Sequence, residues 1–110
     1  MANIYKNAFL DLTTANTTIY TAPSDSRAII QNIQVANDTA NNNNVDIFIR
    51  DSSASSDHEI CHDQLGTKET INLAKGPIIL EENDYLFGKA SANDSARLML
   101  SILEINRNQV

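Results

Sequence analysis

The residues best suited to chemistry lie together in the segment DHEICHD, which spans Asp57 to Asp63. This segment holds both histidines of the chain, His58 and His62, and its single cysteine, Cys61. On an extended strand, residues two positions apart point to the same face, so the two histidines are placed to share one metal ion. Carboxylates would have to complete the site, because the chain has no further histidine or cysteine.

A polar edge strand is the simpler interpretation of this segment, with Cys61 packed as a small hydrophobic residue. A Cys–His nucleophile would need a cysteine of lowered pKa and an oxyanion pocket. Cys61 and His62 are adjacent, and adjacent strand residues point to opposite faces, so the two would not meet. We therefore predict no catalytic residues, no enzyme activity, and no bound metal or other cofactor. If the chain does bind a metal ion, His58 and His62 are the candidate ligands.

Acidic residues gather at two other places, Glu81-Glu82 with Asp84 and Asp51 with Asp57. A calcium loop needs alternating oxygen ligands, usually with a glycine and a closing glutamate, and the segment EENDYLFG lacks that spacing. Turns capped by acidic side chains are the simpler interpretation. The chain has only three glycines, which leaves no phosphate-binding loop, and nothing in the sequence groups its three tyrosines into a carbohydrate-binding platform.

Composition narrows the class of protein further. A chain of 110 residues corresponds to one domain, here residues 1–110, and is long enough for a modest core. A net charge of −6 and a pI near 4.6 argue against nucleic-acid binding and against attraction to anionic membranes. One cysteine excludes an intrachain disulfide and fits a reducing cytoplasm. The first residues lack the layout of a signal peptide, and no apolar run reaches the roughly 20 residues of a membrane helix.

Turn-forming Asn, Ser and Asp residues alternate with short Ile, Val and Leu segments, which is typical of an all-β chain. Eight strands are predicted: Tyr5–Leu12, Thr17–Thr21, Arg27–Asn37, Val45–Arg50, His58–Leu65, Thr70–Ala74, Tyr85–Ala90 and Ala96–Ile105. They predict a two-sheet antiparallel β-sandwich, with a jelly roll as one specific form. A helix over residues 96–106 is the main local alternative, since Leu98, Ile102 and Ile105 are also at helical spacing. The strand is favoured because short isolated helices are marginal and the other strands need a partner.

Alternation along the strands assigns residues to the core. Three inward-facing sets are predicted: Ile29, Ile33 and Val35, with Gln31 as an interruption; Val45, Ile47 and Ile49; and Leu98, Leu100 and Ile102. Pro23 lacks an amide donor and is placed at the corner before the third strand. The run Asn41–Asn44 is predicted to supply residues that tolerate left-handed backbone.

Several large apolar residues fall on the opposite, outward faces of the predicted strands. They are Phe9, Phe48, Met99, Leu103 and Ile105. In a sandwich, the outward face of a strand meets solvent, and large apolar patches on soluble domains usually mark interfaces. We predict that these residues make subunit contacts. The alternative is that some of them are covered by loops.

Four segments together resemble a known group of proteins: IYTAPSDSRAIIQNIQVAN, VDIFIRDSS, GPIILEENDYLFGKAS and LMLSILEI. In this order they are similar to the small β-sandwich virion structural proteins of tailed bacteriophages, of the decoration (cement) or tail-associated type. The likeness covers roughly residues 17–105 and lies in strands and turns, without a catalytic signature. Ser24-Asp25-Ser26 stands where the family pattern has a glycine-containing turn, so we expect this corner to differ in geometry.

The resemblance implies a non-enzymatic component of the virion, most specifically a capsid cement or decoration protein that oligomerises and binds the capsid surface. It implies a homo-oligomer, with a trimer favoured, whose partners are the major capsid protein or other virion subunits. Assembly in the host cytoplasm and the absence of nucleic-acid and membrane partners are also implied. The alternative role is a tail, neck or fibre subunit that binds host glycan or acts as an adaptor.

Overall fold

The computed structural model describes residues 3–93 and 96–106, and the regular elements in these residues are all β-strands. They are β1 (Asn3–Asp11), β2 (Thr17–Thr21), β3 (Ser26–Asn37), β4 (Asn43–Asp51), β5 (Ser56–Leu65), β6 (Thr70–Asn72), β7 (Ile78–Leu80), β8 (Tyr85–Ala90) and β9 (Ala96–Asn106). All but β7 correspond to predicted strands, and β7 is the short apolar stretch that follows Pro77. No helix in this part of the chain is long and apolar enough to cross a membrane.

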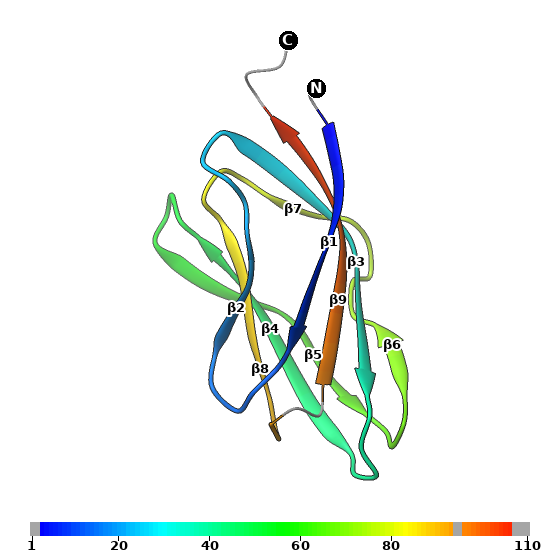
Figure 1. Cartoon of the computed structure of the whole chain (residues 1–110). Helices are drawn as coiled ribbons and strands as arrows, with labels where there is room; N and C mark the ends of the chain where they lie inside the picture. The colour runs from blue at the N-terminus through cyan, green and yellow to red at the C-terminus, as the bar shows by residue number, and fades with distance from the viewer. Residues whose placement is uncertain (1–2, 94–95, 107–110) are drawn as a thin grey trace.

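The strands form two antiparallel sheets packed together, which confirms the predicted all-β sandwich. Sheet A has the order β1-β9-β3-β6, with β7 also paired to β3, and sheet B has the order β2-β8-β4-β5. Figure 1 shows β1, β9 and β3 running beside one another, with β2 and β8 in the second layer. Strand β9 pairs with β1 on one side and β3 on the other, so the helical alternative for residues 96–106 is wrong.

Side chains from both sheets fill one hydrophobic core. The predicted inward faces of β4 and β9 are confirmed, because Val45 and Ile47 are fully buried and Leu98 to Ile102 alternate inward. The other large buried apolar side chains are Leu12, Ile30, Ile33, Val35, Leu65, Leu73, Leu80 and Leu86. Each such side chain contributes about 1.5–3 kcal/mol when it is fully buried, so this core is the main source of stability.

A β-bulge in β3 changes which residues face the core. The register with β9 shifts between Ile30 and Asn32, so Gln31 is an extra residue in the strand. Before the bulge Ile30 is buried, and after it Ile33 is buried, whereas Ile29 lies on the outer face. The prediction that Ile29 shares the core face with Ile33 is therefore wrong, because strict alternation does not hold across a bulge.

Left-handed backbone occurs elsewhere than predicted. Among the described non-glycine residues, positive φ angles belong to Ser55 (54°), Lys68 (58°) and Asn83 (70°), and not to the run Asn41–Asn44. Asn43 in that run is buried, and its side-chain oxygen accepts a hydrogen bond from the Ser91 amide at 3.1 Å. The Asn43 side chain thus links the start of β4 to the turn after β8.

The corner at Pro23 closes without a glycine. The Ser26 amide donates to the Pro23 carbonyl at 3.2 Å, and the Ala22 amide donates to the Asp84 carbonyl at 2.9 Å. No residue of this corner has a positive φ. The sequence Ser24-Asp25-Ser26 therefore suits the turn, since glycine is required only where the backbone is left-handed.

A buried polar bridge links the two sheets. Glu104 of β9 continues the inward face of that strand and is only 6% exposed. Its carboxylate accepts a hydrogen bond from the Tyr20 hydroxyl of β2 and pairs with the Lys6 ammonium of β1 at 3.2 Å. Burial, followed by the interaction with Glu104, raises the pKa of Tyr20 above its ordinary value. The bridge thus joins β2 of sheet B to β9 and β1 of sheet A.

Candidate functional site

A second bulge determines the geometry of the His-containing segment. In the register of β5 with β4, Glu59 lies opposite Phe48 and Cys61 opposite Ile47, which leaves Ile60 as the extra residue. Because directly paired residues share a face, Glu59 is on the outer face and Cys61 on the inner one.

The same register separates the two histidines. His58 pairs with Ile49, an inward residue of β4, whereas His62 pairs with Asp46 on the outer face. The expectation that His58 and His62 share a face was therefore wrong. Instead, the bulge brings Glu59 to the face of His62, and these residues meet Asp46 of the neighbouring strand. The histidine left on the inner side, His58, accepts or donates a hydrogen bond with the Ser56 hydroxyl at 2.9 Å.

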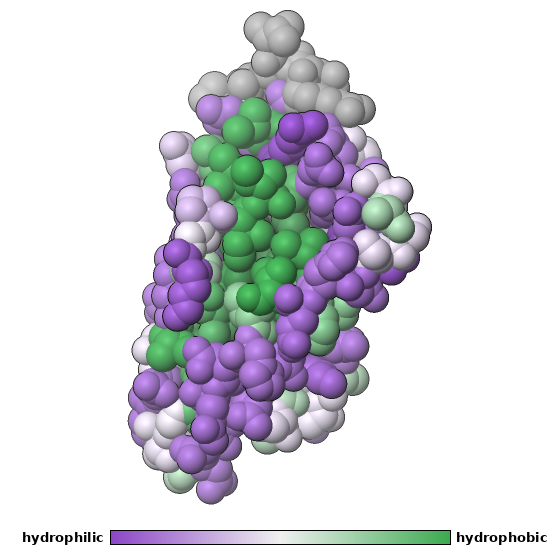
Figure 2. Space-filling view, turned by 180° about the vertical axis from the view of Figure 1, so that it is seen from behind, coloured by the Kyte–Doolittle hydropathy of each residue, from purple (hydrophilic) through white to green (hydrophobic). Residues whose placement is uncertain are grey.

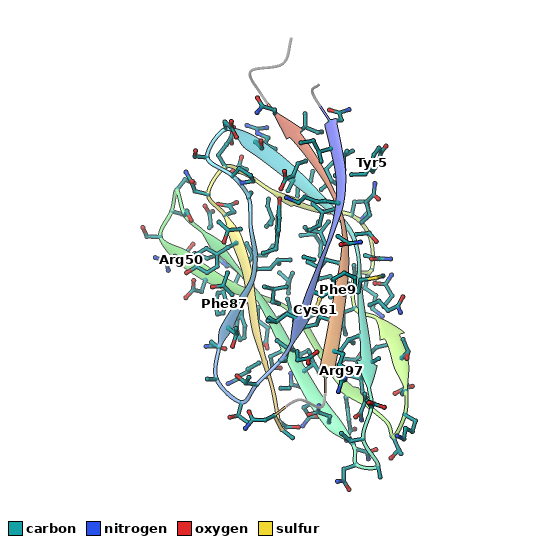
Figure 3. All side chains as sticks on the ribbon, viewed as in Figure 1. Tyr5, Phe9, Arg50, Cys61, Phe87 and Arg97 are labelled. Atoms are coloured by element: carbon teal, nitrogen blue, oxygen red, sulfur yellow. The ribbon has the colours of Figure 1, made fainter. Side chains whose placement is uncertain are left out.

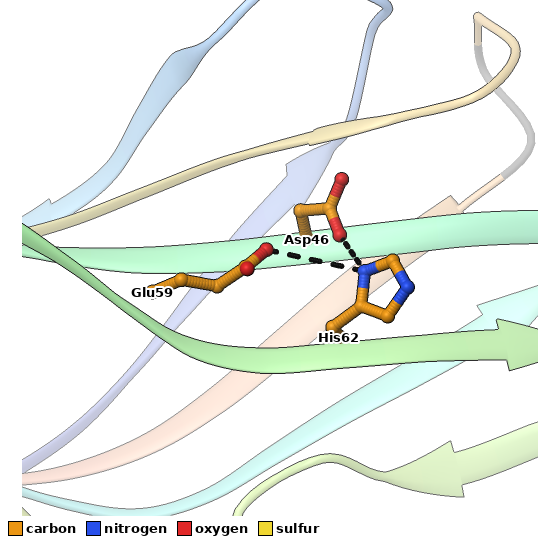
Figure 4. A group of neighbouring side chains, drawn as sticks. All are labelled: Asp46, Glu59 and His62. Carbon is orange, nitrogen blue, oxygen red and sulfur yellow. Dashed lines mark hydrogen bonds and ion pairs between the residues drawn. The ribbon is translucent and has the colours of Figure 1, made fainter.

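Asp46, Glu59 and His62 form a mixed nitrogen and oxygen group on the outer face of sheet B (Figure 4). The His62 Nδ1 atom is hydrogen-bonded to Asp46 Oδ1 and lies 3.9 Å from Glu59 Oε2. One donor atom from each residue lies within 4.8 Å of the others. The hydrogen bond from His62 to Asp46, and then the charge of Asp46, raise the pKa of His62 above its ordinary value.

Cys61 is placed as a structural residue. Its thiol donates to the Leu73 carbonyl with an S···O distance of 3.4 Å, and the side chain packs against the core. Burial raises the pKa of the Cys61 thiol, which disfavours the thiolate that a nucleophile requires. Cys61 also lies on the inner face of β5, whereas His62 lies on the outer face. This arrangement fits the interpretation of Cys61 as a small hydrophobic residue.

The acidic residues of the loops cap turns, as the sequence indicated. The Asp84 carboxylate accepts hydrogen bonds from the amides of Ser52 at 3.0 Å and Glu81 at 3.1 Å. Asp51 accepts from the Ser53 hydroxyl at 2.8 Å, and this hydrogen bond lowers the pKa of Asp51. Asp84 is buried, so it fastens the β4–β5 hairpin to the turn between β7 and β8.

Aromatic residues gather on the outer face of sheet B. Phe48 and Phe87 stack with ring centroids 5.1 Å apart, and Tyr85 lies 5.8 Å from Phe87. Beside them is a pocket of about 240 Å³, near the labelled Arg50 and Phe87 of Figure 3. The residues that line it are Asn16, Thr18, Asp57, Tyr85 and Phe87. Phe48, predicted as an interface residue, belongs to this aromatic group and so lies on the other sheet from the rest of the predicted set.

An exposed apolar row crosses the outer face of sheet A. The registers place Tyr5 opposite Leu103, Leu103 opposite Ile29, and Ile29 opposite Ile79, so these residues lie in line across β1, β9, β3 and β7. We call these four residues the sheet A row. Tyr5 is 76% exposed and Ile79 is 63% exposed, and Figure 3 shows Tyr5 projecting away from sheet B.

The predicted interface residues of sheet A lie in and beside this row. Leu103 belongs to it, Phe9 is exposed opposite Met99, and Ile105 is next on the outer face of β9. Sequence reasoning missed Tyr5, Ile29 and Ile79. Ile29 was assigned to the wrong face because of the bulge, and Ile79 lies in a strand of only three residues.

Hydrophobic surface also occurs at the β5 edge. A pocket of about 250 Å³ there is lined by Ile60, Cys61, Leu73, Ala74, Lys75, Gly76, Pro77 and Ile78. Figure 2 shows hydrophobic residues gathered in a continuous band on the face seen from behind, with hydrophilic residues on both sides. Such bands are uncommon on soluble monomers and usually mark contacts with other molecules.

Comparisons with solved structures identify chains of the same fold. A chain of the acid-stable capsid of Helicobacter pylori bacteriophage KHP30 is 13% identical, with a TM-score of 0.58 over 97% of this chain and 90% of that chain. A chain of the disulfide-linked pili of Bacillus endospore appendages is 10% identical, with a TM-score of 0.54 over 96% of this chain and 88% of that one.

A third solved structure is larger. A chain of the T13 IBDV viral particle is 7% identical, with a TM-score of 0.55, and the match covers 96% of this chain but only 32% of that chain. At these identities the likeness concerns the fold alone. No protein-family model and no curated protein matches the sequence. These three solved structures, which share the fold of this chain, come from two virus particles and from pili.

Proposed function

We propose that this chain is a non-enzymatic structural subunit of a virus particle, in which copies of the chain pack together through the sheet A row. The observation that carries this proposal is the row itself. Tyr5, Leu103, Ile29 and Ile79 span the sheet, and its two ends are largely exposed. A soluble chain of net charge −6 gains nothing from such a row as a monomer, whereas a subunit interface removes it from water. The fold shared with capsid subunits supports the same role.

The strand order supports a jelly roll as the specific form of the sandwich. β6 pairs with Gln34–Ala36 of β3 and β7 pairs with Ala28–Ile30, so the two short strands together occupy one strand position. Each sheet then has four positions, in the orders β1-β9-β3-β6/β7 and β2-β8-β4-β5. Eight positions in two such sheets are the architecture of jelly rolls, which viral capsid domains commonly use.

The finer proposal is a cement or decoration protein of a tailed bacteriophage. In this role a homo-oligomer, with a trimer favoured, binds the major capsid protein from outside the particle after assembly in the host cytoplasm. The negative charge of the chain suits the outer surface better than contact with packaged DNA. The polar segments 38–44 and 51–57, which include the β3–β4 and β4–β5 turns, are the segments we propose for contact with neighbouring shell subunits.

Light scattering of the purified chain, coupled to size exclusion, tests the oligomer. Wild type is expected to form a homo-oligomer, and Ile79→Ser is expected to shift it toward monomer. Ile4→Ser is the matched control, because Ile4 is 51% exposed and pairs with Glu104, on the other face of β1 from Tyr5. A wild-type chain that stays monomeric, and that binds neither procapsids nor expanded capsids, would contradict the proposal. Copy number by mass spectrometry of purified virions separates decoration, with hundreds of copies, from a tail or neck subunit with a handful.

The aromatic pocket of sheet B favours a second candidate function, a tail or fibre subunit that binds host glycan. Tyr85 and Phe87 offer apolar ring surface beside the amide, hydroxyl and carboxylate groups of Asn16, Thr18 and Asp57. Sugars present the complementary combination of apolar faces and hydroxyl groups. A glycan array on the purified chain tests this function, with Tyr85→Ala as the disabling variant and Tyr5→Ala as the control. An array without hits, together with labelling of the capsid, would exclude it.

A further inference from the structure

We propose that Asp46, Glu59 and His62 form a binding site for a divalent transition-metal ion such as Zn²⁺. The site lies on the outer face of sheet B, whereas the sheet A row lies on the opposite surface of the sandwich. The proposal is therefore independent of the proposed function, and either can fail without the other. It differs from the earlier expectation of a His58–His62 site, because only His62 of that pair contributes.

The donor set indicates the class of metal. One imidazole nitrogen and two carboxylate oxygens are ligands that Zn²⁺ accepts, and three protein ligands leave a fourth position for water. The imidazole argues against Ca²⁺ and Mg²⁺, which prefer oxygen ligands only. The loop group of Asp51, Glu81 and Asp84 offers carboxylates alone, and those of Asp51 and Asp84 already cap turns, so it has no comparable claim.

The distances are compatible with coordination after small side-chain rotations. One donor atom from each of the three residues lies within 4.8 Å of the others. Ligands of a tetrahedral zinc ion with bonds of about 2.0–2.1 Å lie about 3.4 Å apart. The side chains of His62 and Glu59 are 70% and 45% exposed and can move inward, whereas Asp46, at 20%, is held more firmly. The required change is thus confined to the two exposed side chains.

The backbone that carries these residues is fixed by strand pairing. Asp46 and His62 are directly opposite each other in β4 and β5. Glu59 and His62 are three residues apart, and in a regular strand they would face opposite ways. The bulge at Ile60 places both residues on the outer face. Bulges commonly redirect a side chain to the other face of a strand in this way. All three positions therefore lie on rigid elements rather than on loops.

Metal binding at this site competes with a proton. Asp46 of β4 and Glu59 and Asp63 of β5 all act on His62 in the direction that favours the imidazolium. Lys89 of β8 lies opposite Asp46 on its other side and adds a positive charge that opposes a cation. The ion must displace the Nδ1 proton of His62 to solvent, so we expect binding to strengthen with pH and to release a proton.

The test is a thermal melt and a calorimetric titration of the full chain with ZnCl₂, with MgCl₂ as the comparison. Zn²⁺ is expected to raise Tm, EDTA to reverse the rise, and Mg²⁺ to have no effect. His62→Asn and Asp46→Asn are each expected to weaken Zn²⁺ binding by about tenfold or more, equivalent to about 1.4 kcal/mol. His58→Asn is the matched control, because this second histidine of β5 faces the other way.

The histidine ring signals in NMR spectra provide a separate readout, since Zn²⁺ should shift those of His62 and leave those of His58 in place. The proposal is overturned if saturating Zn²⁺ leaves Tm unchanged, or if His58→Asn loses as much affinity as His62→Asn. Circular dichroism of each variant checks folding; should one variant unfold, the other of the pair His62→Asn and Asp46→Asn decides the outcome. A failure here leaves the oligomer measured by light scattering untouched.

Discussion

Replacing Tyr20 with phenylalanine tests whether the bridge to Glu104 holds the two sheets together. The substitution removes only the hydroxyl group. The aromatic ring, which packs against the core in the wild type, is kept. A hydrogen bond to a charged partner contributes about 1.5–3 kcal/mol. Glu104 is buried but keeps its ion pair with Lys6 at 3.2 Å, so the carboxylate is not left unpaired. We therefore expect a loss of about 2 kcal/mol in the free energy of unfolding.

The expected change in melting temperature follows from the size of the chain. An unfolding entropy of about 2.1 cal/mol/K per residue gives about 230 cal/mol/K for 110 residues. A loss of about 2 kcal/mol then lowers Tm by about 8–9 °C. Thermal melts by circular dichroism and urea midpoints measure it. Tyr5→Phe is the matched control: it removes the same hydroxyl group from a side chain that is 76% exposed, so Tm should stay nearly unchanged.

Two results would refute this reasoning. One is a Tyr20→Phe variant whose Tm falls by less than about 2 °C. The other is a Tyr5→Phe variant whose Tm falls as far as that of Tyr20→Phe. A cycle with Glu104→Gln isolates the coupling between the two residues, because each single variant alters only one side of the hydrogen bond.

The remaining predictions concern the backbone under the metal-binding group, the charge of His62 and alkaline stability. Gly88→Ala places a Cβ atom 2.6 Å from the Asp46 carbonyl and should cost about 1–3 kcal/mol by urea denaturation, whereas Gly76→Ala meets nothing within 4 Å and should be neutral. NMR should find His62 titrating above its ordinary pKa of about 6.5, and Asp46→Asn should lower that pKa; an unchanged pKa would contradict the pairing. The stabilisation from this pair is present below pH about 6.5 and is lost as pH rises through the raised pKa. The pKa of Tyr20 is also raised, so its contribution to the free energy of unfolding is fully present below pH about 10 and is lost above it. Wild-type stability should therefore fall more steeply above that pH than the stability of Tyr20→Phe, and equal slopes would contradict this prediction.

Alternation in the sequence was sufficient wherever a strand is regular. The inward faces of β4 and β9 follow strict alternation, and Val45, Ile47 and Leu100 are buried as predicted. The two errors of face have one cause. Gln31 and Ile60 are extra residues in β3 and β5, and a bulge leaves no mark in the pattern of apolar residues. After each of these residues, the alternation of inward and outward side chains is shifted by one position.

The candidate sites were less accessible to sequence reasoning because they depend on which strands are neighbours. Asp46 joins His62, and Tyr5 joins Ile79, only through the register of the sheets. Glu104 did carry a signal that was overlooked. It is the single charged residue at the inward positions of β9, two residues after Ile102, and a charge there needs a partner.

The bulges at Gln31 and Ile60 also have a consequence for how the gene can change. Each is in effect a one-codon insertion that the strand absorbs locally. Deleting Ile60 would leave Glu59 and Cys61 opposite the same residues of β4 as before, each on its present face, within a regular strand. Elsewhere in a strand, gaining or losing one codon would turn every following side chain over. Homologous genes are therefore expected to differ in length by one codon at these two points, with both surfaces of each sheet preserved.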